Sequence, residues 1–407
     1  MAGMSLRPHL AAYQPQLDQL DAAALTPIVC RALSRRGVVP VSWRWFPVLY
    51  AAYYPRRMLV RLAGEATVGG ETFAWAAVVK ISESPAEEAR STSATAAWDR
   101  EVRAYQSGLL RHLPDGLAAP RAQRIGTDAD GAVWLWLEHV ADAFGGQWPL
   151  AQYGIAARHL GRFNGVYGTH ATGRPLPAYR WLNQLWAESH AEPALLPDAR
   201  REVGELLAHL DVRGAVSAST ADRLRRLLDD QPIFLDTLAR LPQTLCHHDA
   251  SSANLFARRR ATPGQATDEG DEGDTWETVA IDWEELGPGP VGAEVATLVF
   301  GTMRRGAFPT HRALELEQTV LEGYQRGLRD AGWRGDPQVM LLGYSAAVAL
   351  RWFVAPAALR LLADPAARAR AQRATHQTAD ILIQQRLALL DFLLDRADEA
   401  RRLADVG

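Results

Sequence analysis

The chain has only two cysteines, Cys30 and Cys246, among its 407 residues. Two distant cysteines are too few for a disulfide framework or a four-cysteine metal site, so both are predicted to be buried thiols. No stretch approaches 18 uncharged apolar residues, and the first 20 residues lack a basic segment followed by an apolar run. We therefore expect no membrane segment and no secretory leader, and a cytoplasmic location.

The sequence also lacks an excess of either charge. The formal net charge is −3, with 22% charged and 48% hydrophobic residues. This balance disfavours a disordered chain and a nucleic-acid binder. A chain of this length can bury a large core and form two or three domain-sized units. Its partners must then be recognised at a localised site and not through overall charge.

The most informative segment is LCHHDASSANLF at Leu245 to Phe256, followed by VAIDWE at Val279 to Glu284. The two apolar runs end at Cys246 and at Ile281, immediately before polar residues. This pattern predicts a β-hairpin with polar side chains at its mouth.

Two carboxylates and one amide in these segments form an all-oxygen set, namely Asp249, Asn254 and Asp282. Such a set suits a hard, partly hydrated cation such as Mg²⁺ better than zinc. The carboxylate that is not needed for the metal can orient a nucleophile. The alternative interpretation of the Asp-Ala-Ser-Ser run is a turn or a helix cap, because these side chains bond to local backbone.

The pattern resembles the catalytic and metal loops of the aminoglycoside phosphotransferase and choline kinase-like family. That family has His-x-Asp, four residues, Asn, and a later Ile-Asp-Trp/Phe, which are matched here by His247, Asp249, Asn254 and Asp282. The resemblance implies Asp249 as catalytic base, Asn254 and Asp282 as Mg²⁺ ligands, and His247 as a residue that structures the loop. It also implies a protein-kinase-like fold.

A lysine, Lys80, interrupts the apolar run over residues 76–81. A lysine in such a run is costly unless its ammonium meets anionic partners. Glu101 lies on a predicted helix over 94–110 that resembles the family's Arg-Glu-x-x-x-Tyr helix, and it is the predicted partner. The resemblance implies that Lys80 and Glu101 hold the ATP phosphates. The alternatives are an edge-strand lysine that blocks aggregation and a solvated helix glutamate.

The run from Ala132 to Asp142 reads as a strand that continues into a polar linker. It resembles the hinge between kinase lobes, which implies that backbone groups of Glu138 and Val140 hold adenine. An ordinary strand end is the alternative. The implied domains are an N-lobe over residues 1–140 with the nucleotide-binding sheet and helix, a hinge near 138–142, and a helical C-lobe over 141–407 with the catalytic loop, metal loop and substrate pocket.

The expected fold class is α+β: a bilobal protein-kinase-like fold with a small antiparallel-sheet N-lobe and a large, mainly helical C-lobe. Strand patterns cover residues 38–54, 57–66 and 72–81, with a turn at Val68-Gly69-Gly70. Helical patterns cover residues 151–166, 223–241, 314–331 and 378–403.

Several features depart from the family pattern or stand apart from it. No glycine occurs over residues 42–57, where protein kinases carry a glycine-rich loop, and Arg56 or Arg57 are the candidates for phosphate contact. Glu294 stands where the family often has an Asp that steadies the catalytic loop. His248 occupies a position that is usually small, and it is expected to be exposed or bonded to backbone. The acidic segment 261–277 is predicted to be a hairpin tip.

The leading hypothesis is transfer of the γ-phosphoryl group of ATP, with Mg²⁺, to a hydroxyl of a small molecule such as an aminoglycoside, another antibiotic or a metabolite. GTP is not excluded as donor. The alternative is a catalytically inactive kinase-like nucleotide-binding module, suggested by the missing glycine loop and by Glu294. The sequence determines neither the acceptor nor the oligomeric state.

Overall fold

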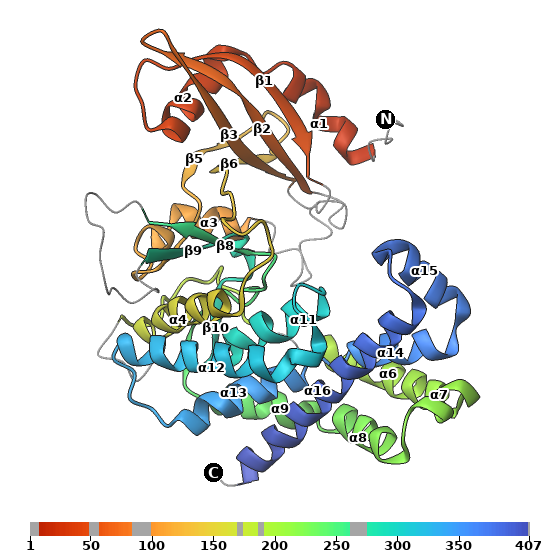
Figure 1. The fold of residues 1–407 in the computed structure, drawn as a ribbon. Helices are drawn as coiled ribbons and strands as arrows, with labels where there is room; N and C mark the ends of the chain where they lie inside the picture. The colour runs from red at the N-terminus through yellow and green to blue at the C-terminus, as the bar shows by residue number, and fades with distance from the viewer. Residues whose placement is uncertain are drawn as a thin grey trace. The chain divides into compact units, whose positions relative to one another are not determined.

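The computed structural model describes residues 8–48, 57–83, 99–168, 174–185, 191–260 and 275–405. Two compact units divide the chain: Met1–His112 with Ala119–Ala141, and Leu113–Ala118 with Asp142–Gly407. The first unit contains an antiparallel sheet and the second is mostly helical (Figure 1). The predicted fold class, α+β with an antiparallel-sheet N-terminal part and a helical C-terminal part, is therefore confirmed.

The first unit is organised around a five-stranded antiparallel sheet of order β1-β2-β3-β6-β5. Its strands are β1 (Val39–Pro47), β2 (Arg57–Val68), β3 (Glu71–Ser82), β5 (Ala122–Thr127) and β6 (Val133–Glu138). Gly69 and Gly70 form the β2–β3 turn with φ of +58° and +89°. Two successive positive φ angles are the requirement of a tight hairpin turn, so the turn predicted here is confirmed.

Helices accompany this sheet in the first unit. They are α1 (Pro8–Asp18), α2 (Ala22–Leu33), α3 (Arg100–Gln106) and the 3-10 turn η4 (Leu109–Arg111). Leu25 and Ile28 of α2 pack with alternate residues of the sheet, such as Val60 and Val79, in one apolar core. The helix predicted over 94–110 is described from Asp99 onward and ends at Gln106.

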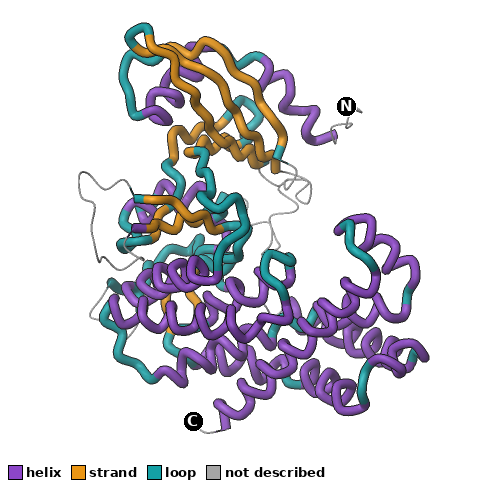
Figure 2. Tube along the Cα trace, viewed as in Figure 1, coloured by secondary structure: helices purple, strands orange, loops and turns teal. Residues whose placement is uncertain are grey.

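The second unit is dominated by helices, drawn in purple in Figure 2. They are α4 (Leu150–Val166), α6 (Ala191–Ala208), α7 (Leu210–Ala215), α8 (Ala218–Asp229), α9 (Gln231–Arg240), α10 (Ala293–Ala296), the π-helical turn η7 (Thr297–Gly301), α11 (Thr302–Arg304), α12 (Ala313–Asp330), α13 (Pro337–Ala349), α14 (Val354–Ala363), α15 (Pro365–Thr375) and α16 (Ala379–Asp405), with 3-10 turns η6 (Trp283–Glu285) and η8 (Thr310–Arg312). The single helix predicted over 223–241 is wrong. It is two helices, because the chain breaks at Asp230 and Pro232 lies in the first turn of α9.

Helices α4 and α12 pack closely because glycines line their contact. A Cβ atom on Gly327 would lie 1.9 Å from the carbonyl oxygen of Arg158, and one on Gly161 would lie 2.3 Å from that of Tyr324. Only glycine allows the two backbones to approach this far. Helix α4 of this pair also contacts strands of the second unit.

The strands of the second unit pair differently from the predicted hairpin. They are β4 (Leu117–Ala118), β7 (Gln243–Cys246), β8 (Leu255–Arg259), β9 (Trp276–Ala280) and β10 (Gly287–Pro290). The hairpin is formed by β8 and β9, whereas β7 pairs with β10. The prediction that the strand ending at Cys246 belongs to the hairpin is therefore wrong. Two-stranded pairing tolerates the prolines of β10 because an edge strand does not need every N–H.

Three smaller predictions can be compared with the described residues. Of the acidic segment 261–277, residues 261–274 lie outside them, and Trp276 and Glu277 belong to β9. Arg56 lies outside them as well, and of Arg57 only the backbone is described. Cys246 is buried as predicted, while Cys30 is only half-buried.

Across the described ranges, no single helix combines the length and apolar character that a membrane crossing needs. The helices α13 and α14 meet the criterion only when taken together, and they are bent by 42° at their break.

Candidate active site

Lys80 and Glu101 form an ion pair within the first unit. The Nζ atom of Lys80 lies 2.7 Å from Oε2 of Glu101, and the two side chains are 20% and 10% exposed. Strand β3 lies between β2 and β6, so Lys80 is not on an edge strand, and Glu101 is buried. Both alternative interpretations of this pair are therefore wrong, and the predicted contact is confirmed. Their role toward ATP stays a prediction.

Lys80 is also the only lysine among 407 residues, although Lys and Arg together number 44. All the other residues in this count are arginines. A compact ammonium that can be desolvated differs chemically from a guanidinium, and the single exception stands on a central strand. The lysine count is a signal in the sequence that supports a specific task for this side chain.

Glu138 is the last residue of β6, the strand that pairs with β3. Its carboxylate accepts hydrogen bonds from the backbone N–H of Arg121 at 3.1 Å and from the Arg121 side chain at 3.2 Å. Val140 follows two residues later and is half-buried. The Glu138 carboxylate is therefore bonded to Arg121. The prediction that this segment binds adenine concerns its backbone groups and not this side chain.

Glu294 anchors the segment that carries the catalytic motif. Its carboxylate accepts hydrogen bonds from the backbone N–H groups of His247, at 2.6 Å, and of His248, at 3.1 Å. The side chain is fully buried, and burial raises its pKa to about 7 although these bonds favour the charged form. Glu294 thus reaches the loop despite being longer than the Asp that the family pattern has.

His247 joins the two motif segments through both ring nitrogens. Its Nδ1 accepts the backbone N–H of Asp249 at 3.2 Å, so Nε2 must carry the proton that is donated to the carbonyl of Ile281 at 2.9 Å. The ring lies 4.6 Å from that of Trp283 and is fully buried. These contacts tie the two motif segments together, and the loop-structuring role of His247 stays a prediction.

His248 is bonded to backbone, as one of the two expected outcomes stated. It has φ of +67°, which is unusual for a residue with a side chain. Its Nε2 lies 3.0 Å from the carbonyl oxygen of Pro288 in β10, and its own carbonyl accepts the hydroxyl of Thr297 at 3.1 Å. The residue therefore fixes the loop between β10 and the π-helical turn.

Asp249, Asn254 and Asp282 converge at the ends of the strands. The amide nitrogen of Asn254 donates to Oδ2 of Asp249 at 2.7 Å and to its carbonyl at 3.0 Å. The backbone N–H of Ile281 donates to the carbonyl of Asn254 at 2.9 Å, which continues the β8–β9 ladder up to Asp282. Burial and the nearby Asp282 carboxylate raise the pKa of Asp249. The Asp249 and Asp282 carboxylates are therefore close enough to repel each other.

These groups fit a magnesium ion. The nitrogen of the Asn254 side chain is bonded to Asp249, so Oδ1 is the atom with which Asn254 would ligate a metal, and Asp282 would add carboxylate oxygens. In the described part of the chain, no group of three or more His, Cys, Asp or Glu side chains could hold a metal. Two oxygen ligands with the remaining positions left to phosphate and water are characteristic of Mg²⁺ and do not suit zinc. A cation here would also relieve the repulsion between the two carboxylates.

Asn164, a buried residue that the sequence patterns did not indicate, supports the strand that precedes the catalytic loop. Asn164 of α4 donates to the carbonyl of Leu245 at 2.7 Å and accepts the hydroxyl of Tyr324 at 2.6 Å. The Tyr324 hydroxyl in turn accepts the backbone N–H of Gly292 at 3.2 Å. The only signal in the sequence is an asparagine on an apolar helix, where burial requires partners.

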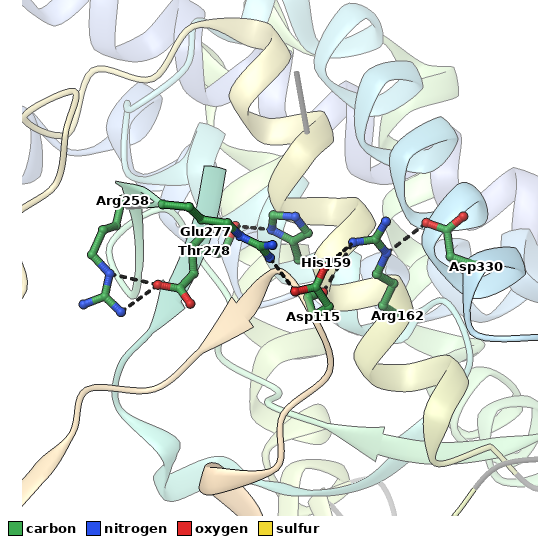
Figure 3. A network of polar contacts seen from close by, with 8 residues as sticks. Asp115, His159, Arg162, Arg258, Glu277, Thr278 and Asp330 are labelled. Carbon is green, nitrogen blue, oxygen red and sulfur yellow. Dashed lines mark hydrogen bonds and ion pairs between the residues drawn. The ribbon is translucent and has the colours of Figure 1, made fainter. Parts of the chain in front are cut away.

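The β8–β9 hairpin is held by a second polar network (Figure 3). His159 of α4 lies 2.9 Å from the Thr278 hydroxyl, and Arg258 forms an ion pair with Glu277 across the hairpin. Arg162, also on α4, contacts Asp330 at 2.9 Å and Asp115 at 3.8 Å. The hairpin ends carry Asn254 and Asp282, so this network fixes the position of both residues on the second unit.

Comparisons with known proteins give matches among solved structures only, since no family model and no curated protein matches the sequence. An amicoumacin kinase in complex with AMP-PNP, Ca²⁺ and amicoumacin is 13% identical, with coverage of 83% of this chain and 86% of the other and a TM-score of 0.44. An aminoglycoside phosphotransferase from Alicyclobacillus acidocaldarius is 15% identical, with coverage of 83% and 90% and a TM-score of 0.45. The GDP complex of aminoglycoside 2'-phosphotransferase-IIIa is 14% identical, with coverage of 93% and 100% and a TM-score of 0.41. The chain is thus similar, at low identity, to solved aminoglycoside phosphotransferases, the proteins that its motifs resemble.

Proposed function

We propose that the protein transfers the γ-phosphoryl group of ATP to a hydroxyl of a small molecule, with Mg²⁺ as cofactor. The observation that carries this proposal is the convergence of Asp249, Asn254 and Asp282 at the ends of β8 and β9, on a loop anchored by Glu294. The proposal extends to GTP as an alternative donor.

Asp249 is the proposed base. Its Oδ2 is held by Asn254, which leaves Oδ1 to accept the proton of the acceptor hydroxyl as the new O–P bond forms and the bond to ADP breaks. Positioning of the hydroxyl contributes more than proton removal, because the phosphoryl group is transferred through a loose transition state.

Asn254 and Asp282 would hold the metal. When bound, Mg²⁺ supplies charge neutralisation at the phosphate oxygens. Lys80, paired with Glu101, would hold the nucleotide phosphates, and backbone groups of Glu138 and Val140 would bind adenine. In this proposal residues 1–140 form the nucleotide-binding lobe, residues 138–142 the hinge and residues 141–407 the catalytic and acceptor lobe. An enzyme that consumes ATP in this way is proposed to act in the cytoplasm.

The decisive test is a panel of hydroxylated metabolites and antibiotics, scored by ATP-dependent product formation. Asp249→Asn should reduce transfer by about 10²- to 10⁴-fold, because it removes the base and keeps the shape of the side chain. The affinity for MgATP, measured by calorimetry, should change little. Equal transfer rates in the variant and the wild type would remove Asp249 from the mechanism.

A second variant tests the metal assignment and the alternative function together. Asp282→Ala should weaken the stabilisation by MgATP in a thermal-shift assay, since a ligand that binds only the folded protein raises its stability. Equal MgATP affinity in both proteins would contradict the metal assignment. MgATP binding by the wild type without transfer to any acceptor or to water would instead favour the inactive nucleotide-binding module.

A further inference from the structure

Four arginines of the second unit form what we call the arginine cluster: Arg304, Arg305, Arg351 and Arg386. Arg305 and Arg351 lie close enough to the proposed base, Asp249, to act on its charge, and Arg386 contacts Arg304, the neighbour of Arg305 in the chain. Arg304 ends α11, Arg305 follows it, Arg351 follows α13, and Arg386 lies on α16. None of them belongs to the motif from which the function was proposed. They come together from three separate parts of the chain.

Arg351 is connected to the catalytic loop through hydrogen bonds. Its Nη2 donates to the hydroxyl oxygen of Thr297 at 2.6 Å, and that hydroxyl donates to the carbonyl of His248 at 3.1 Å. His248 directly precedes Asp249. The guanidinium also lies 6.0 Å from the centre of the Phe300 ring. These contacts place a fixed positive charge two hydrogen bonds away from the residue before the base.

Arg305 lies on the helical segment that packs against the same loop. A Cβ atom on Gly301 would lie 3.4 Å from Cβ of Ser251, so this turn touches the loop directly. The backbone N–H of Arg305 donates to the carbonyl of Gly301 at 3.1 Å, which puts Arg305 one turn further along. Arg305 and Arg351 both act on the Asp249 carboxyl, where they lower its pKa against the larger effects of burial and of Asp282.

Arg386 is half-buried and faces another cation. Its Nη1 donates to the carbonyl of Arg304 at 3.3 Å, and burial together with the Arg304 charge lowers the pKa of Arg386. Among the residues that the structure describes, neither Arg305 nor Arg386 forms an ion pair with a carboxylate, whereas Arg158, Arg162 and Arg396 all do. A partly desolvated cation such as Arg386 is stabilised by an anion that pairs with it.

We infer that the arginine cluster binds an anionic group of the acceptor, a phosphate or a carboxylate, while the acceptor hydroxyl meets Asp249. This inference rests on the proposed function and narrows its substrate class to hydroxylated small anions, such as sugar acids or sugar phosphates. Arginine pairs with such groups through two parallel hydrogen bonds. A polycationic aminoglycoside would meet like charge at this position and is a poor acceptor.

Inorganic phosphate is the probe for the cluster, titrated by calorimetry into the full chain with the nucleotide site saturated by MgADP. Arg305→Gln and Arg386→Gln should each raise the dissociation constant for phosphate about tenfold, as expected when one charged contact is lost. Arg334→Gln is the matched control, because the Arg334 side chain, like that of Arg386, donates to backbone carbonyls, and Arg334 lies after α12, outside the arginine cluster. No binding to the wild type, or equal binding by both cluster variants and the control, would overturn the inference.

The arginine cluster would bind the phosphoryl group in transfer by the same contacts as an anionic group of the acceptor. A second titration in saturating Mg-AMP-PNP, which fills the γ-phosphoryl position, separates these two sources. Phosphate that still binds supports an acceptor subsite. Binding that is present with MgADP and lost with Mg-AMP-PNP assigns the arginines to the transferred group and overturns the inference.

Failure of the proposed function would be recognised separately. If neither nucleotide binds, the proposed function fails, and the phosphate titration of the nucleotide-free protein still tests the cluster. If nucleotide and phosphate both bind, transfer to gluconate or glucose 6-phosphate should exceed transfer to glucose and to kanamycin. Preference for the aminoglycoside would overturn the assigned substrate class.

Discussion

Two polar networks of the second unit hold the candidate site, and they differ in how far their charges are removed from water. The catalytic loop depends on Glu294, which is fully buried and bonded to two backbone N–H groups. The β8–β9 hairpin depends partly on ion pairs such as Arg258 with Glu277, whose side chains are 35% and 26% exposed. A buried acceptor is costly to remove because its donors stay buried, while an exposed pair is replaced by water.

The largest effect is expected for Glu294→Ala. The variant leaves the N–H groups of His247 and His248 without their acceptor, and we expect a loss of about 3 kcal/mol in the free energy of unfolding. Urea unfolding followed by circular dichroism measures it. Glu294→Gln keeps one carbonyl oxygen and should lose clearly less. An alanine variant within about 1 kcal/mol of the wild type would contradict the anchoring role.

Gly116→Ala should be the next most damaging change, because it disturbs the contact between α4 and β9. Gly116 has φ of +92°, and a Cβ atom would lie 2.2 Å from the ring of His159. We expect a loss of about 2–3 kcal/mol, from backbone strain and overpacking together. Gly131→Ala is the control, since Gly131 has φ of +84° and open space around its Cβ position. Equal losses in the two variants would mean that contact with His159 contributes nothing.

A smaller, pH-dependent effect is expected from His159. Burial, followed by nearby arginines, lowers its pKa from 6.5 to about 3. The unfolded chain therefore takes up the proton first as the pH falls, and stability decreases from about pH 6.5 down to about pH 3. The charged groups around the ring are Arg158, Arg162, Arg260 and Asp115.

Between pH 7 and pH 5 the protonation of His159 in the unfolded chain should lower the free energy of unfolding by about 2 kcal/mol, since one pKa unit corresponds to about 1.4 kcal/mol. His159→Gln removes the ionisable ring. The pH dependence of its unfolding free energy should be smaller than that of the wild type by this amount. Parallel pH profiles for the two proteins would show that His159 is not the titrating group.

The smallest effect is expected for Arg258→Gln. Arg258 and Glu277 lie directly opposite each other on β8 and β9, yet both side chains reach solvent. The loss should stay below about 1 kcal/mol, as for exposed ion pairs and cross-strand pairs in general. A loss as large as that of Glu294→Ala would remove the distinction between the buried and the exposed network.

The elements that the sequence predicted well are those with local causes. The Gly69-Gly70 turn follows from two residues that tolerate positive φ, and the Lys80–Glu101 contact follows from the need of a buried ammonium for a partner. The long helices α12 and α16 were placed within a few residues because their apolar periodicity extends over several turns.

The pairings that the sequence did not predict depend on contacts between distant residues. β7 pairs with β10, whose Gly-Pro-Gly-Pro sequence has the local character of a turn. Likewise, Asn164 lies 81 residues before Leu245, and nothing in its neighbourhood indicates that pairing. Arg351 and Arg386 become candidate site residues only when the fold packs α13 against α10 and α16, and α16 against α11. In the candidate site, the chemical groups were therefore predictable, whereas their support and the arginine cluster were not.

The single lysine has a consequence for chemical modification. An amine-directed reagent, an acetylating enzyme or a lysine cross-linker finds one ε-amino group in this sequence, and that group is paired with Glu101 on a central strand. Reagents that normally modify many sites of a protein would therefore report on one position here. Any loss of function that follows acylation of side-chain amines can be ascribed to Lys80 without mapping.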